Sequence, residues 1–112
     1  MGTRARIAVV CEQGTILSNW VNRDGSDLEH QLNTQWPTLE KAVALITGGG
    51  EISSLWFGKN NVQYYHDVVP NERWKCYDSE QQYVDDCNQD IFIEFGYLFK
   101  NGKWVTIYGN ND

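Results

Sequence analysis

The chain is 112 residues long, the usual size of one domain, and we expect a single domain over residues 1–112. Its formal net charge is −6, from nine basic and fifteen acidic residues. No cluster of Lys or Arg provides the basic face that displaces counterions from phosphates, so direct binding to nucleic acid is not expected.

The cysteine pattern and the hydropathy indicate a reducing compartment. The three cysteines, Cys11, Cys76 and Cys87, form no Cys-x-x-Cys pair and have no zinc-ligand spacing with the two histidines. The first residues lack the apolar stretch of a signal peptide, and the longest apolar run, residues 42–46, is too short to cross a bilayer. We therefore expect a cytoplasmic protein without membrane contact, metal or cofactor.

Two β-rich runs open the chain, at residues 6–12 and 15–22, and Gly14 interrupts them. Such runs around a glycine-containing turn predict a β-hairpin. A helix is expected next, with Leu28 and Leu32 on its buried side.

Residues 38–46 have the clearest helical pattern in the chain. Leu39, Val43 and Ile46 recur at spacings of four and three, which predicts that they form one buried helix face. Three glycines follow at residues 48–50. They favour a helix end with a flexible exit over a phosphate-binding loop, because a helix precedes them and the Lys-Ser/Thr pair of a P-loop is absent.

The second half of the chain contains further strands and one polar helix. Residues 62–69 are typical of a strand, and residues 79–89 predict a helix with Tyr83, Val84 and Cys87 facing inward.

The strongest local signal is the C-terminal hairpin. Residues 91–99 and 104–108 are rich in β-branched and aromatic side chains, and they flank the pair Asn101-Gly102. Asn-Gly is the commonest tight hairpin turn, because both residues tolerate positive φ.

The predicted order is therefore strand, strand, helix, helix, one or two strands, helix, strand, strand. This order predicts the α+β class. We expect an antiparallel sheet built from an N-terminal and a C-terminal hairpin, with two to three helices packed on one face.

Tyr65, His66 and Asp67 bring a histidine next to a carboxylate, two groups that acid–base catalysis uses. In a strand, however, Tyr65 and Asp67 share one face while His66 points to the other, so His66 and Asp67 do not form a dyad. The nucleophile motif Gly-x-Ser-x-Gly is also absent. We therefore do not predict an enzyme. A hydrolase or nuclease that uses His66 with Asp67 or Asp24 is a less favoured hypothesis than a binding protein.

Two arginines near the start of the chain suggest an anion site. Arg4 and Arg6 are two residues apart and would share one strand face, where two guanidinium groups suit a phosphate or a carboxylate. On the neighbouring strand Trp20, Asn22 and Asp24 share one face by the same alternation. This cluster predicts either a ligand pocket or a salt-bridged sheet surface, and both readings stay open.

Several stretches, in the same order along the chain, resemble a group of small uncharacterised proteins of tailed bacteriophages. They are the start Met1-Gly2-Thr3-Arg4, the element Arg23-Asp24-Gly25, residues 50–55, residues 64–67 and the aromatic hairpin of residues 97–104. In that group, Cys-His usually precedes a Trp-Asp-Gly element and Tyr follows it. This chain lacks the Cys-His, the Trp and the Tyr. The resemblance therefore implies corresponding positions only for Arg4, Asp24 and Gly25. The resemblance implies a phage origin.

Acidic residues gather in the second half of the chain, at Asp78, Glu80, Asp85, Asp86, Asp90 and Glu94. They predict either a solvated helix face or a surface that competes with nucleic acid for a basic host protein. Aromatic residues are 13% of the chain, more than a small core needs, so we expect some rings at a binding surface.

The leading hypothesis is a phage accessory protein of the host cytoplasm, which inhibits or modulates a host or anti-phage defence protein by stoichiometric contact. The alternative is a binder that sequesters a nucleotide-like small molecule through Arg4, Arg6 and Trp20, as a homo-oligomer with sites between subunits. The candidate binding residues are Arg4, Arg6, Trp20, Asn22, Arg23, Asp24, Tyr65, His66 and Asp67.

Overall fold

The computed structural model describes residues 3–22, 25–26, 28–48, 52–55, 62–64 and 75–109. In chain order the elements are β1 (Ala5–Val10), β2 (Ile16–Val21), α1 (Glu29–Gln35), α2 (Leu39–Thr47), β3 (Ile52–Leu55), β4 (Val62–Tyr64), β5 (Lys75–Tyr77), α3 (Glu80–Gln89), β6 (Phe95–Lys100) and β7 (Lys103–Gly109).

The seven strands form one mixed sheet with the order β4-β3-β2-β1-β6-β7, and β5 pairs with β2 beside this path. The α+β class and the two terminal hairpins, β1–β2 and β6–β7, are confirmed. The expectation of a purely antiparallel sheet is wrong, because β1 runs parallel to β6 and β2 runs parallel to β3. Each hairpin is encoded locally, whereas the pairing of β1 with β6 joins segments about ninety residues apart.

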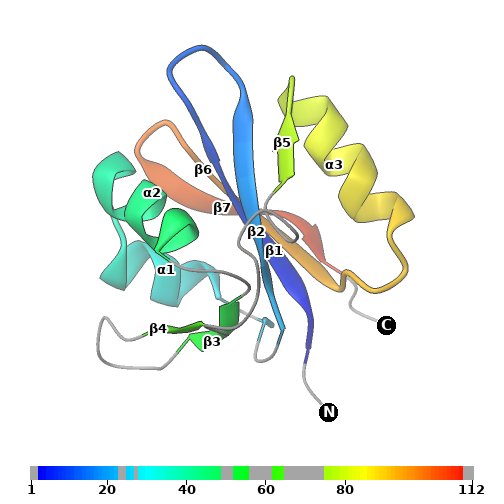
Figure 1. Cartoon of the computed structure of the whole chain (residues 1–112), viewed down its shortest axis with the longest axis horizontal. Helices are drawn as coiled ribbons and strands as arrows, with labels where there is room; N and C mark the ends of the chain where they lie inside the picture. Colours follow the sequence, from blue (N-terminus) through cyan, green and yellow to red (C-terminus); the bar gives the residue numbers. More distant parts are fainter. Residues whose placement is uncertain are drawn as a thin grey trace.

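The helices cover both faces of the sheet, and not one face as expected. Figure 1 shows α1 and α2 on one side of the strands and α3 on the other. Along β1, Ala5, Ile7 and Val9 belong to the core beneath α1 and α2, while Ala8 belongs to the core beneath α3. The unbroken apolar run of residues 7–10 is typical of a strand buried on both faces, which is the local signal for this arrangement.

The C-terminal hairpin has the turn that its sequence predicts. Asn101 has a φ of 53° and Gly102 a φ of 83°, so both turn residues adopt the left-handed region. This backbone matches the right-handed twist of the flanking strands. Lys100 then pairs with Lys103 and Phe99 with Trp104.

Helix α2 is where predicted, but a different face is buried. Thr38 caps it, since its side chain accepts a hydrogen bond from the Lys41 amide. The buried residues are Ala42, Leu45 and Ile46, whereas Leu39 is 44% exposed. Two overlapping apolar stripes are present in this helix, and contact with the sheet selects the one that includes Ala42.

Helix α3 agrees with its prediction more closely. Ser79 caps it by accepting from the Gln82 amide, and Tyr83 and Cys87 are buried against the sheet. Val84 is only half-buried.

Helix α1 closes the edge of the sheet at β7, which among the described strands pairs only with β6. Asn33 Oδ1 accepts from Trp104 N at 2.7 Å, and Asn33 Nδ2 donates to Trp104 O at 3.0 Å. One turn earlier, Glu29 Oε1 accepts from Thr106 N at 2.7 Å. We call these four residues the α1–β7 seam. An unpaired edge strand invites pairing with another chain, and the seam removes three of its free backbone groups.

Asn33→Ala removes both hydrogen bonds between the α1 side chain and the Trp104 backbone. We expect the free energy of unfolding to fall by about 1–3 kcal/mol, because a partly buried donor and acceptor lose their partner. Urea denaturation followed by tryptophan fluorescence measures this loss. Thr34→Ala is the matched control: Thr34 is exposed on the same helix, and its hydroxyl donates only to His30 O. An equal loss in both variants would contradict the role of the seam.

Candidate functional site

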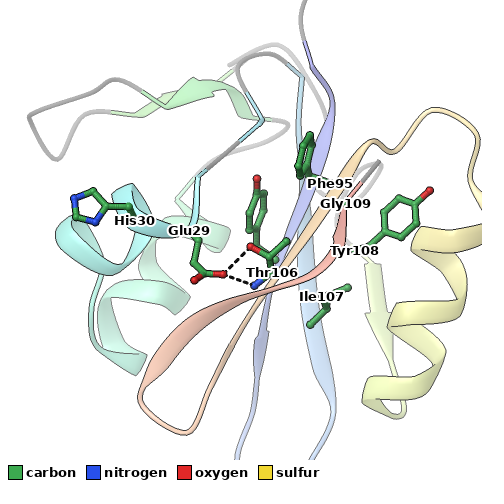
Figure 2. A pocket seen from close by; sticks show the side chains of 8 residues that line it. Glu29, His30, Phe95, Thr106, Ile107, Tyr108 and Gly109 are labelled. Atoms are coloured by element: carbon green, nitrogen blue, oxygen red, sulfur yellow. Dashed lines mark hydrogen bonds between the residues drawn. The ribbon is translucent and has the colours of Figure 1, made fainter. Parts of the chain in front are cut away.

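A groove of about 550 Å³ lies where α1 meets β6 and the end of β7 (Figure 2). This volume is in the range of pockets that hold small molecules. We call it the α1–β7 groove, and its lining residues are Glu29, His30, Phe95, Tyr97, Thr106, Ile107, Tyr108 and Gly109.

Tyr97 fixes one wall of the groove. It is fully buried, and its hydroxyl donates to Gly25 O at 2.6 Å and accepts from Leu28 N at 3.1 Å. These bonds tie the start of α1 to β6. Phe95 lies two residues earlier on the same strand face, and its ring is nearly parallel to that of Tyr97 with the centroids 6.2 Å apart.

Glu29 carries the charge at the groove. Its Oε1 accepts from both the amide and the hydroxyl of Thr106, each at 2.7 Å. Its second oxygen, Oε2, has no hydrogen-bond partner among the described residues. The neighbouring His30 is exposed, and Figure 2 shows its ring turned away from Glu29. The groove therefore presents a fixed carboxylate beside aromatic rings, and Glu29 with His30 does not form an acid–base dyad.

Arg6 lies on the opposite face of the sheet and is buried. Its exposure is 2%, its Nη1 donates to Ser18 Oγ at 3.1 Å, and its guanidinium lies 5.5 Å from the centroid of the Trp20 ring. The antiparallel register pairs Arg6 with Trp20, so these two candidates are brought together as expected. Burial, however, keeps Arg6 from forming a solvent-facing anion site.

Arg4 has a different partner. Its guanidinium lies 5.8 Å from the centroid of the Phe92 ring, and its amide donates to Glu94 Oε1 at 3.2 Å. Arg4 and Arg6 thus stack on separate rings, which does not support the open pair of guanidinium groups expected from their spacing. Asn22 is half-buried, and its amide continues the sheet by donating to Ile52 O. The remaining candidates lie outside the described residues: Arg23, Asp24, Tyr65, His66 and Asp67.

Gly25, which follows Asp24 in the sequence, has a steric role. Its amide donates to Thr3 O at 2.9 Å. A Cβ at this position would lie 2.6 Å from Ala5 Cβ, closer than side-chain carbons approach one another. Only glycine therefore lets the chain pass so close to the start of β1.

The titratable groups under α3 are held in their protonated forms. Burial is the largest cause that raises the pKa of Cys87 to about 12, although the nearby Arg6 cation opposes it. Burial likewise raises the pKa of Tyr83, whose hydroxyl lies 2.9 Å from Arg6 O and 2.8 Å from Tyr97 O. Tyr77 has a raised pKa from burial and from its 2.5 Å hydrogen bond to Asp86. None of these three groups is tuned to exchange protons near neutral pH.

The turn between α3 and β6 exposes two apolar side chains that the sequence pattern predicts to lie in a strand. Ile91 is 87% exposed and Phe92 is 57% exposed. The strand begins only at Phe95, because Asp90 Oδ1 accepts from the Phe92 amide at 2.9 Å and forms a turn. The aspartate before the apolar pair is the signal that could have located this turn. For the α1–β7 groove we find no comparable local signal, because helix and strand residues far apart in the chain build it.

Within the described part of the chain, no three His, Cys, Asp or Glu residues gather as a metal site would require. None of the described helices is long and apolar enough to span a membrane. Comparison of the chain with family models, with curated proteins and with solved structures gives no match.

The three cysteines should react with iodoacetamide in the order of their exposure. Cys76 is exposed, Cys11 is half-buried and Cys87 is buried, so we expect Cys76 to be alkylated first and Cys87 only after unfolding. Peptide mapping by mass spectrometry at pH 8, with and without urea, measures the three rates. Fast alkylation of Cys87 in the native protein would contradict its placement on the buried face of α3.

The raised pKa of Cys87 also predicts a loss of stability in alkaline solution. The thiol ionises near 9.0 when unfolded and near 12 when folded, so the folded state holds this proton more tightly. The resulting stabilisation is complete below pH 9 and declines as the pH rises toward 12. Urea denaturation over this range should give a steeper decline for the wild type than for Cys87→Ala. Parallel declines would show that Cys87 contributes nothing.

Proposed function

We propose that this protein binds a host or anti-phage defence protein stoichiometrically and thereby inhibits or modulates it, without catalysing a reaction. The observation that carries the proposal is the exposure of Ile91 and Phe92, which stand side by side on one turn. Adjacent exposed apolar side chains can form the centre of a protein interaction site, and aromatic residues often dominate such interfaces.

The turn that presents this pair is fixed before any partner arrives. Asp90 Oδ1 accepts from the Phe92 amide, and Asp90 O accepts from the Ile93 amide at 3.1 Å. Ile93 is 2% exposed and anchors the turn in the core beneath α3. Arg4 covers part of the Phe92 ring. A surface that is already ordered loses less conformational entropy when it binds, which favours affinity.

The charge around the turn favours a basic partner. Residues 78–94 contain six of the fifteen acidic residues and no Lys or Arg. The rest of the chain then holds nine acidic and nine basic residues, so this segment carries the whole net charge of −6. Such a concentration of one sign speeds encounter with a partner of opposite charge and makes the association depend on salt.

The phage origin rests on the resemblance to small tailed-bacteriophage proteins, and the cytoplasmic location rests on the cysteine pattern and the hydropathy. Both fit a protein that acts on bacterial proteins. The nucleotide-binding alternative has less support, because the guanidinium of Arg6 is buried against Trp20. No observation favours the homo-oligomer that this alternative includes. The hydrolase hypothesis depends on His66, Asp67 and Asp24, which lie outside the described residues.

Ile91→Ser combined with Phe92→Ser should weaken partner binding strongly. Proteins captured from bacterial lysates on the wild-type protein are purified and titrated by calorimetry, and the activity of each is measured with increasing amounts of the protein. We expect a one-to-one complex, loss of the partner's activity at equivalence, and at least about a hundredfold weaker binding by the double variant, since two hot-spot side chains are lost.

Leu39→Ser is the matched control, because Leu39 is an exposed apolar residue on α2, away from the turn. It should bind like the wild type. The double variant should lose no more than about 1 kcal/mol of its free energy of unfolding, which allows for the lost contact between Arg4 and the Phe92 ring. If no captured protein binds at a defined ratio, or if Leu39→Ser weakens binding equally, the proposal is wrong.

A further inference from the structure

We infer that the α1–β7 groove is a binding site for a small organic cation, an alkylammonium or alkylguanidinium group. The site goes beyond the proposed function, because it uses neither Ile91 nor Phe92. Glu29 would supply the negative charge, and the partly exposed ring of Phe95 would supply the wall against which the cation lies (Figure 2).

The carboxylate is oriented before a ligand binds. Both hydrogen bonds from Thr106 reach Glu29 Oε1 and hold the group at the groove. Oε2 can accept a hydrogen bond from a ligand, since it has no partner within the described residues. A hydrogen bond from a cationic N–H to a carboxylate is about twice as strong as one between neutral groups. The exposed position of Glu29 weakens this attraction through solvent screening, so a second contact is needed for affinity.

The aromatic wall provides that contact. The ring of Phe95 is partly exposed, and the buried ring of Tyr97 supports it in a nearly parallel arrangement from the adjacent same-face position of β6. A cation within about 6 Å of a ring centroid gains about 0.5–1 kcal/mol at an exposed site and more when water is excluded. The same pairing occurs elsewhere in this protein, where Arg6 stacks on Trp20 and Arg4 on Phe92.

The charge of the groove discriminates against anions. Among the described residues, the eight that line the groove include one carboxylate and no Lys or Arg. Two lysines elsewhere form ion pairs with α3, Lys75 with Asp86 and Lys100 with Glu80. A carboxylate or phosphate ligand would meet Glu29 without a compensating lysine or arginine among the described residues that line the groove. The volume of about 550 Å³ exceeds what one ammonium or guanidinium group with a short alkyl chain requires.

The test is a titration of the isotope-labelled full chain with butylammonium, methylguanidinium and butyrate at constant ionic strength, followed by amide NMR. We expect both cations to shift the amides of Glu29 and Thr106 saturably, whereas butyrate does not. Glu29→Gln keeps an oxygen acceptor for the Thr106 amide and removes only the charge, so binding should weaken by about tenfold or more.

Glu40→Gln is the matched control, because it removes the same charge from an exposed position on α2 outside the groove. It should bind both cations like the wild type. Phe95→Leu tests the wall separately and should weaken binding by about threefold or more, through loss of the ring contact. Hydrogen exchange at Thr106 verifies that the seam persists in each variant.

Two further measurements complete the design. The first compares the affinity of Nα-acetyl-arginine amide with that of methylguanidinium. Tighter binding of the arginine amide identifies a peptide side chain as the source of the cation, and tighter binding of methylguanidinium identifies a free small molecule. The Ile91→Ser, Phe92→Ser double variant should keep its cation binding, which separates this site from the proposed partner surface. Absence of saturable shifts, or equal binding by wild type and Glu29→Gln with Thr106 still protected, would overturn the inference.

Discussion

The side chain of Asn33 replaces the missing neighbour strand of β7 by pairing with both backbone groups of Trp104. Helix α1 has only seven residues, too few to be stable alone in water, so it depends on such tertiary contacts. The indole of Trp104 adds a hydrogen bond from Nε1 to Trp36 O at 2.7 Å, at the other end of the helix. The seam therefore stabilises the edge strand and the helix together.

The same constraint creates the groove. Glu29 and Asn33, one helical turn apart, bond to alternate residues of β7, Thr106 and Trp104. Past Thr106 the strand continues to Gly109, whereas α1 begins at Glu29. The seam therefore reaches only part of β7, and the groove occupies the space beside the rest, with Tyr97 behind it. The Glu29 carboxylate, which bonds to the edge strand β7, is thus also placed beside the rings of Phe95 and Tyr97.

Local sequence signals predicted the parts of this fold that local physics determines. Asn101-Gly102 fixed the last hairpin through its two positive φ angles, and Ser79 capped α3 as its position suggests. The parallel pairing of β1 with β6 could not be predicted, because the sequence of each hairpin does not determine which of its strands pairs with the other hairpin. The groove depends on this pairing and on the seam, so its residues were missed. Arg6 was correctly placed beside Trp20 by strand alternation, but alternation does not reveal that α3 covers that face.

The two proposed binding surfaces share one physical device, a carboxylate that accepts from a backbone amide. Asp90 holds the Phe92 amide at the α3–β6 turn, and Glu29 holds the Thr106 amide at the groove. In each case the hydrogen bond is complete without a ligand, so the group that would meet the partner is already oriented. A small domain has little core with which to offset the entropy of ordering loops on binding. Fixing its recognition groups through backbone hydrogen bonds avoids that cost, and it explains why both surfaces lie at the ends of regular elements.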